Sequence, residues 1–257
     1  MTGPPVLFIH GPWLHASSWG PWIELFGAAG HRASAPGWPG HADTVQDARD
    51  NPESIADHGI DDIVEHYTTL IAALPDLPVL VGHSLGGFIA ERLLRQDLAA
   101  AAAAVAVDAA RITDMPPALP LFRNPANRRK AVSLTAEQFR SVFGGAVSAQ
   151  ESAELYDRWS IPAPCRPLFE ATAAGFDPHR SANGDPADPP RGPLLLITGD
   201  GQHRAPATRA TDVVAFPDRG HCLTIDSRWR AVADAALTWL RDRSLSSPHT
   251  EPHTERS

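Results

Sequence analysis

The chain is poor in cysteine, and this limits the kinds of site it can build. Its 257 residues hold two cysteines, Cys165 and Cys222, and neither belongs to a CxxC pair. A zinc site of the finger or ribbon type is therefore not expected. A disulfide between the two is also disfavoured, because we find no secretion signal in the chain.

Positive charge and long apolar runs are scarce as well. Lys and Arg number 22 against 30 Asp and Glu, so the net charge is −8, and no basic stripe stands out. This argues against a nucleic-acid partner. The longest apolar run, 98–107, is too short and too rich in alanine to span a bilayer. The first residues lack the basic segment of a signal peptide. We expect a cytoplasmic protein without a membrane partner, and its oligomeric state is not predictable.

What is present is ordinary globular composition, with 43% hydrophobic and 20% charged residues. Short apolar runs typical of buried strands alternate with segments of helical periodicity. The expected strands are 6–10, 31–36, 78–82, 103–108, 194–198 and 213–216. The expected helices are 17–31, 59–75, 85–96 and 227–243. This alternation predicts an α/β fold with a mostly parallel, doubly wound sheet and helices on both faces.

The pattern changes between residues 110 and 190, where prolines recur and no strand is predicted. Two helices there begin at capping boxes, Thr135 with Gln138 and Ser148 with Glu151. We therefore predict a core formed by 1–109 and 191–243, a helical cap over 110–190, and a flexible tail over 244–257.

The strongest chemical signal is GHSLG at 82–86, a G-x-S-x-G pentapeptide between a predicted strand and a predicted helix. A tight strand-to-helix turn would lift the Ser84 hydroxyl clear of the sheet. Gly82 and Gly86 are needed because a side chain at either position would collide with neighbouring backbone. The start of the following helix would favour developing negative charge. Ser84 is therefore the candidate nucleophile.

A serine hydroxyl needs a base, and His221 is the best candidate. It follows a predicted strand near the end of the chain, so the order serine before histidine agrees with this kind of site. His10 is expected to support the neighbouring loop, and His83 is expected to be buried by packing.

Five segments occur together in a characteristic order: HG at 10–11, APGWPGH at 35–41, GHSLGG at 82–87, LLLITGD at 194–200 and DRGH at 218–221. In this order and spacing the chain resembles the α/β-hydrolase superfamily over about residues 4–241, with 110–190 in the place of its helical cap. The opening HGPWLHASSW is similar to the start of small-molecule esterases and hydroxynitrile lyases. The resemblance implies the fold, whereas the reaction stays open because the fold hosts many chemistries.

The resemblance also implies a triad acid in the turn after 194–198, and there the chain departs from the pattern. The acid position falls on Gln202. Asp200, two residues earlier, and Asp108, at the end of the preceding strand, are the candidate acids. A site with no carboxylate partner is the third alternative.

A second departure concerns the oxyanion hole. The resemblance implies one donor at the Leu85 backbone N–H and another at the residue after HG. That residue is Pro12, which has no N–H. Loss of one such donor typically costs about 10²–10³ in rate. The Trp13 N–H is the candidate replacement, and the alternative is that Pro12 only shapes the turn.

The cap is expected to roof an apolar pocket above Ser84. The candidate lining residues are Pro12, Trp13, Phe139, Phe143, Trp159 and Phe169. The sequence has neither GxGxxG nor HExxH, so no cofactor and no metal site are expected. Three functions remain open: a serine hydrolase for a small, mostly apolar ester or acyl compound; a lyase, isomerase or cyclase of a natural-product or other small-molecule pathway that uses the same Ser84 and His221; and a non-catalytic ligand-binding protein.

Overall fold

The computed structural model describes residues 3–95, 103–108, 120–121, 124–173, 192–199 and 211–243. Six strands form one sheet in the order β2-β1-β3-β4-β7-β8, and every neighbouring pair is parallel. The strands are β1 (Val6–Ile9), β2 (Ala33–Ser34), β3 (Val79–His83), β4 (Ala103–Val107), β7 (Leu194–Thr198) and β8 (Thr211–Ala215). The predicted mostly parallel sheet is confirmed.

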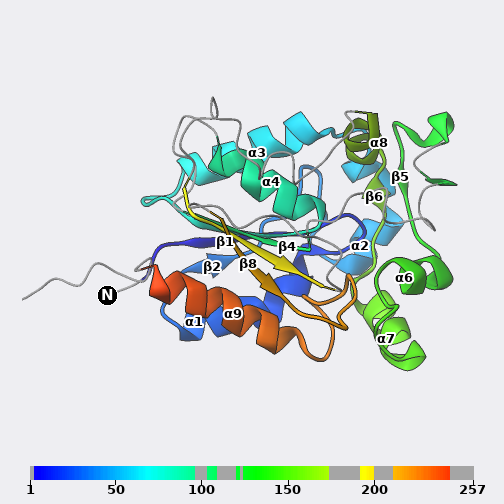
Figure 1. Ribbon diagram of the computed structural model, residues 1–257. Helices are drawn as coiled ribbons and strands as arrows, with labels where there is room; N and C mark the ends of the chain where they lie inside the picture. Colours follow the sequence, from blue (N-terminus) through cyan, green and yellow to red (C-terminus); the bar gives the residue numbers. More distant parts are fainter. Residues whose placement is uncertain are drawn as a thin grey trace, which may run out of the picture.

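Helices cover both faces of this sheet (Figure 1). On one face lie α3 (Ile60–Ala72) and α4 (Leu85–Leu94), and on the other lie α1 (Gly20–Ala28) and α9 (Trp229–Asp242). Each face has its own apolar cluster, because successive strand residues point to opposite sides. Leu7 and Ile9 pack toward α3 and α4, whereas Val6 and Phe8 pack toward α1 and α9.

The middle of the chain lies beyond the carboxyl ends of the strands (Figure 1). It contains α6 (Ala136–Val142), α7 (Ala149–Trp159) and α8 (Arg166–Ala173). The expectation of no strand here is wrong, since β5 (Ala131–Val132) and β6 (Ala163–Pro164) form an antiparallel pair. Two-residue strands are too short to show an alternating pattern. The domain boundaries stay a prediction, and most of 110–123, all of 174–190 and the tail 244–257 lie outside the described residues.

The remaining elements are short, and one corrects a predicted boundary. They are η1 (Ala16–Trp19), α2 (Val45–Asp50), η2 (Pro52–Ile55) and η5 (Pro125–Asn127). The helix expected over 17–31 is instead η1 followed by α1, because Pro21 lies in the first turn of α1 and starts a new helix there. No side chain caps α1, whereas the His15 side chain caps η1.

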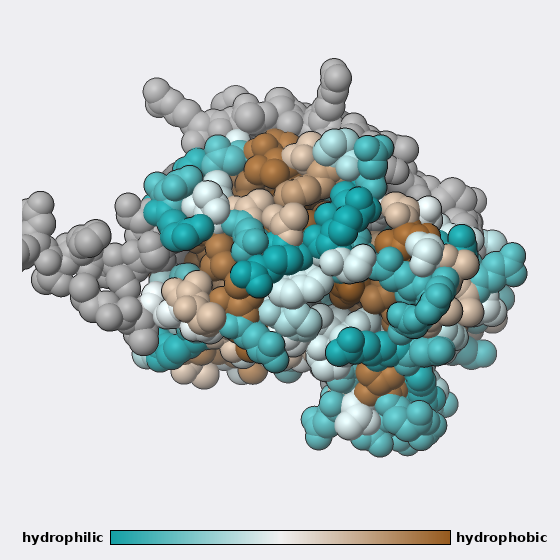
Figure 2. Space-filling model, turned by 90° about the horizontal axis from the view of Figure 1, so that it is seen from below, coloured by the Kyte–Doolittle hydropathy of each residue, from teal (hydrophilic) through white to brown (hydrophobic). Residues whose placement is uncertain are grey.

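Figure 2 shows hydrophilic residues across much of the face seen from below, and they separate its hydrophobic areas. Leu77 is the one large hydrophobic side chain that is strongly exposed in the described part of the chain. Within the same residues, no helix combines the length and apolar character needed to cross a bilayer.

Candidate active site

Ser84 occupies a strained turn between β3 and α4. Its backbone has φ 55° and ψ −124°, a left-handed conformation that costs a non-glycine residue about 1–3 kcal/mol. A Cβ on Gly82 would lie 2.1 Å from the Gly86 carbonyl oxygen, and one on Gly86 would lie 2.3 Å from that of Ile9. The backbone therefore leaves no room for a side chain at either position, as the sequence predicts.

Two further segments meet at Ser84. A Cβ on Gly11 would lie 3.0 Å from the Ser84 Cβ, so the loop after β1 passes directly beside the serine. Leu85 is the first residue of α4, and the N-terminal end of a helix favours negative charge. A group attached to Ser84 would thus lie next to both backbone segments expected to bind an oxyanion.

His221 is held by the carboxylate of Asp108. The His221 Nδ1 donates to Asp108 Oδ2 over 2.6 Å, and the two side chains are 8% and 11% exposed. Asp108 directly follows β4, with φ 44°, and its own N–H donates to the Ile197 carbonyl over 2.7 Å. The His221 Nε2 is buried and has no hydrogen-bond partner within the described residues. Because Nδ1 donates to Asp108, Nε2 is the nitrogen left to act as a base.

Of the two candidate acids, the structure brings Asp108 to His221. Asp200 and Gln202 lie outside the described residues. Asp108 reaches the site because β4 lies between β3, which leads into Ser84, and β7 in the sheet.

The loop that carries His221 is fixed by groups that sequence reasoning missed. Arg219 and Asp226, both nearly fully buried, form a two-point ion pair with distances of 2.6 and 3.2 Å. His83, expected only to pack, donates from Nε2 to the His221 carbonyl over 2.8 Å. Burial and the neighbouring His221 lower the pKa of His83 to about 3. His83 is therefore a neutral donor, and no local sequence pattern marks it or the ion pair.

The loop after β1 is hydrogen-bonded to the middle of the chain, through residues 132 and 161. Trp13 is 1% exposed and has φ 63°. Its indole N–H donates to the Val132 carbonyl over 3.0 Å, and its own carbonyl accepts from the Ile161 N–H over 3.1 Å. Pro12 is buried beside it. Residues 132 and 161 therefore fix this loop conformation.

The candidate lining aromatics lie in different surroundings. The Phe143 ring lies 5.2 Å from the His221 ring and stacks on Phe139 at 4.8 Å, and both phenylalanines are buried. Trp159 and Phe169 are half-buried and pack against the same apolar cluster. Phe143 is thus the candidate for which the structure shows contact with the site.

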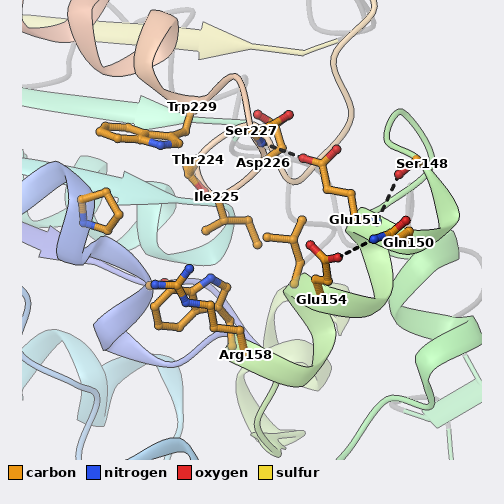
Figure 3. A pocket seen from close by; sticks show the side chains of 14 residues that line it. Ser148, Gln150, Glu151, Glu154, Arg158, Thr224, Ile225, Asp226, Ser227 and Trp229 are labelled. Carbon is orange, nitrogen blue, oxygen red and sulfur yellow. Dashed lines mark hydrogen bonds between the residues drawn. The ribbon is translucent and has the colours of Figure 1, made fainter.

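A separate cavity of about 510 Å³ opens between α7, the start of α1 and the loop after His221 (Figure 3). Trp159 lines it, whereas neither Ser84 nor His221 does. The substrate pocket above Ser84 therefore stays a prediction. Across the described ranges, no group of three or more His, Cys, Asp or Glu is arranged to hold a metal ion. Cys165 and Cys222 are both free and buried.

The comparisons with known proteins agree with the α/β fold. The sequence profile of the alpha/beta hydrolase family matches residues 6–235. No curated protein matches the chain. Among solved structures, a thermophilic esterase from Thermogutta terrifontis has a TM-score of 0.65 and 19% identity, with 96% of this chain and 92% of that one covered.

Two further structures are similar in the same way. The methylesterase MES16 from Arabidopsis has a TM-score of 0.63 and 15% identity, covering 93% of this chain and 99% of its own. Tomato methylketone synthase I, solved with 2-tridecanone, has a TM-score of 0.63 and 13% identity, covering 94% and 99%. At such identities these likenesses show the fold, and the profile match shows the family. The chain belongs to the alpha/beta hydrolase family.

Proposed function

We propose that the protein is a serine hydrolase for a small, mostly apolar ester or related acyl compound. Ser84 is the nucleophile, His221 is the base, and Asp108 is the acid that orients the imidazole and stabilises its protonated form. The observation that carries the proposal is the 2.6 Å bond between Asp108 and His221, together with the strained Ser84 turn.

In the first step the Ser84 Oγ attacks the substrate carbonyl while its proton passes to His221 Nε2. The resulting oxyanion accepts hydrogen bonds from the Leu85 N–H and, in place of Pro12, from the Trp13 N–H. The leaving alcohol departs with the proton from His221. Water, activated by the same histidine, then hydrolyses the acyl-enzyme and regenerates Ser84.

Two observations support this substrate class. The apolar Phe143 ring lies beside His221, which favours a substrate with apolar groups near the reacting carbon. Two proteins of similar fold are named an esterase and a methylesterase, and both names point to ester cleavage.

Pro12 favours a second candidate, a lyase, isomerase or cyclase that uses Ser84 and His221 as acid–base or binding groups. Proline removes one backbone N–H where an oxyanion hole would use it. A reaction that develops no tetrahedral oxyanion would tolerate that loss. Methylketone synthase I, whose name indicates other chemistry, has a similar fold.

Covalent labelling with a fluorophosphonate probe separates the two candidates. We expect the wild-type protein to be labelled and Ser84→Ala to be unlabelled. Ser18→Ala is the matched control, because Ser18 is also buried and lies beside the separate cavity. Labelling together with turnover of p-nitrophenyl butyrate supports the hydrolase. A wild-type protein that resists the probe at neutral pH would favour the second candidate.

A further inference from the structure

Three buried or half-buried histidines that the proposed mechanism does not use lie together at the loop 11–16: His10 precedes it, His15 belongs to it, and His41 packs against it. The His41 ring lies 4.8 Å from the His10 ring and 4.5 Å from the His15 ring. Trp38 stacks on His10 at 4.9 Å. His10 and His15 come from the segment after β1, whereas Trp38 and His41 come from the segment after β2. The cluster therefore joins two loops.

The hydrogen bonds of His41 and His15 specify which nitrogen carries the proton. His41 Nδ1 faces the Ala42 carbonyl at 2.9 Å, and its Nε2 accepts from the Ala16 N–H at 3.4 Å. His15 Nε2 faces the same Ala42 carbonyl at 3.1 Å, and its Nδ1 accepts from the Ser17 N–H at 3.1 Å and from the Ser17 hydroxyl at 2.6 Å. A nitrogen that faces a carbonyl must donate, and one that faces an N–H must accept. Both rings therefore have one donor and one acceptor.

His10 follows the same rule. Its Nδ1 faces the Gly11 carbonyl at 2.9 Å, and its Nε2 accepts from the Trp38 N–H at 3.3 Å. All three imidazoles thus bridge backbone groups, and all three must be neutral to do so. A proton on any acceptor nitrogen would place two N–H groups against each other.

The surroundings favour this neutral state. Burial lowers the pKa of His10 and His15, and burial together with His15 lowers the pKa of His41 to about 4. The charged or titratable groups that face the cluster are its own three members, His83 toward His10, and Asp43 toward His15 and His41. Asp43 acts in the opposite direction and raises both values, but burial has the larger effect.

We propose that His41 and His15 are positioning residues for the loop 11–16, and that they hold it in its observed conformation only while the cluster is uncharged. The loop contains Trp13, whose φ of 63° needs support from its neighbours. Val132 and Ile161 supply it from one side. On the other side, His41 accepts from the Ala16 N–H, and His15, within the loop, connects the Ser17 N–H to the Ala42 carbonyl. The link to catalysis rests on the proposed function, in which this loop provides an oxyanion donor.

The first experiment reads the tautomers directly by NMR of protein with ¹⁵N-labelled histidine. At about pH 7 we expect the Nδ1–H tautomer for His10 and His41 and the Nε2–H tautomer for His15, with variants at each position giving the assignments. We also expect the Trp13 indole N–H resonance to shift in His41→Ala. A charged cluster at neutral pH, or an unchanged Trp13 resonance, would overturn the proposal.

The second experiment measures fluorophosphonate labelling of Ser84 and turnover of p-nitrophenyl butyrate at about pH 7. We expect His41→Ala to lower kcat about tenfold to a hundredfold with little change in KM, because a displaced donor weakens transition-state binding. His41→Gln should recover most of the rate, since its Oε1 can accept from Ala16. His31→Gln is the matched control, because His31 is also buried and bonds a backbone carbonyl, that of Pro4.

The outcomes keep the two proposals apart. Equal losses in His41→Ala and His41→Gln, or an equal loss in His31→Gln, would overturn the positioning role. If the wild-type protein is not labelled, the proposed function fails, and the tautomers and the Trp13 resonance still decide the role of the cluster. If His41→Ala does not fold, His15→Ala takes its place, because it removes the bonds to Ser17 and Ala42.

Discussion

At the scale of single residues, the carboxylate of Asp108 is the first group to test. Asp108→Asn keeps the shape but removes the charge and can hold His221 in the wrong tautomer. We expect kcat for p-nitrophenyl butyrate to fall on the order of 10³–10⁴-fold. Asp200→Asn, the other candidate acid, should stay within about threefold of the wild type, the size of an indirect effect. The reverse pattern would move the acid to the turn after β7.

Pro12 permits a test of the oxyanion donor. Pro12→Ala adds an N–H at the position where the family resemblance implies one. If Trp13 is the donor, we expect kcat to stay within about twofold, while the free energy of unfolding falls by about 0.4–1 kcal/mol through the freer unfolded chain. Steady-state kinetics and urea unfolding measure the two effects. A rise of tenfold or more in kcat would assign the hole to residue 12.

These residues also show which features of the site can be predicted from the sequence and which cannot. The tight turn at Ser84 was predictable because its constraints are local: two glycines between a strand and a helix specify it. The sequence alone leaves Asp108, Asp200 and no carboxylate as alternatives for the partner of His221, because the choice depends on which strands are neighbours in space. His15 and His41 lie in motifs quoted for the family resemblance, yet only the through-space bonds to Ala42 and Ala16 indicate what they do.

At the scale of elements, the C-terminal end of α7 depends on Arg49 of α2. Its guanidinium donates to the carbonyls of Tyr156, Asp157 and Ser160 over 2.9–3.1 Å. These are carbonyls near the end of the helix, where a cation is favoured. The next residues pair with the loop after β1 through the bridge between Leu14 and Ser160. Arg49 therefore connects the end of α7 to that loop.

We expect Arg49→Ala to lower the free energy of unfolding by about 0.5–1.5 kcal/mol, a range typical of lost hydrogen bonds and a lost helix-end charge. The control is Arg32→Ala, which removes one exposed ion pair with Asp76 and should cost about 0–1 kcal/mol. Urea unfolding of both variants measures the difference. A loss in Arg49→Ala no larger than in the control would show that α7 ends without its help.

Elements were predictable where their signals are internal. The capping box of α6 is present on both sides, with Thr135 accepting from the Gln138 N–H and Gln138 accepting from the Thr135 N–H. The box predicted at α7 is only half formed. Ser148 accepts from the Glu151 N–H, but the Glu151 carboxylate instead accepts from the Ser227 N–H over 2.7 Å (Figure 3). Glu151 therefore bonds a residue distant in the sequence instead of the N-cap residue of its own helix. A local sequence pattern cannot indicate such a distant partner.

At the scale of the whole molecule, folding must keep several histidines uncharged. His41 and His83 have pKa values lowered to about 4 and about 3, and those of His10 and His15 are lowered as well, each chiefly by burial. An unfolded histidine titrates near 6.5. Between about pH 6.5 and 4 the unfolded chain therefore binds more protons than the native protein. The free energy of unfolding of the native protein rises with pH across that window. The native state is favoured most above pH 6.5 and loses this advantage as the pH falls.

We therefore expect the free energy of unfolding to fall between about pH 7 and 4.5, at up to about 1.4 kcal/mol per pH unit for each such histidine. Urea unfolding at several pH values gives the slope. His41→Gln should make that slope shallower, because its side chain takes up no proton in the unfolded chain, even if the variant is less stable at pH 7. His31→Gln is the control: it shows whether replacing a buried histidine outside the cluster changes the slope in the same way. An unchanged slope in His41→Gln would contradict this prediction. It would mean that His41 takes up its proton equally well in the folded and the unfolded protein, despite the bond that its Nε2 accepts from the Ala16 N–H.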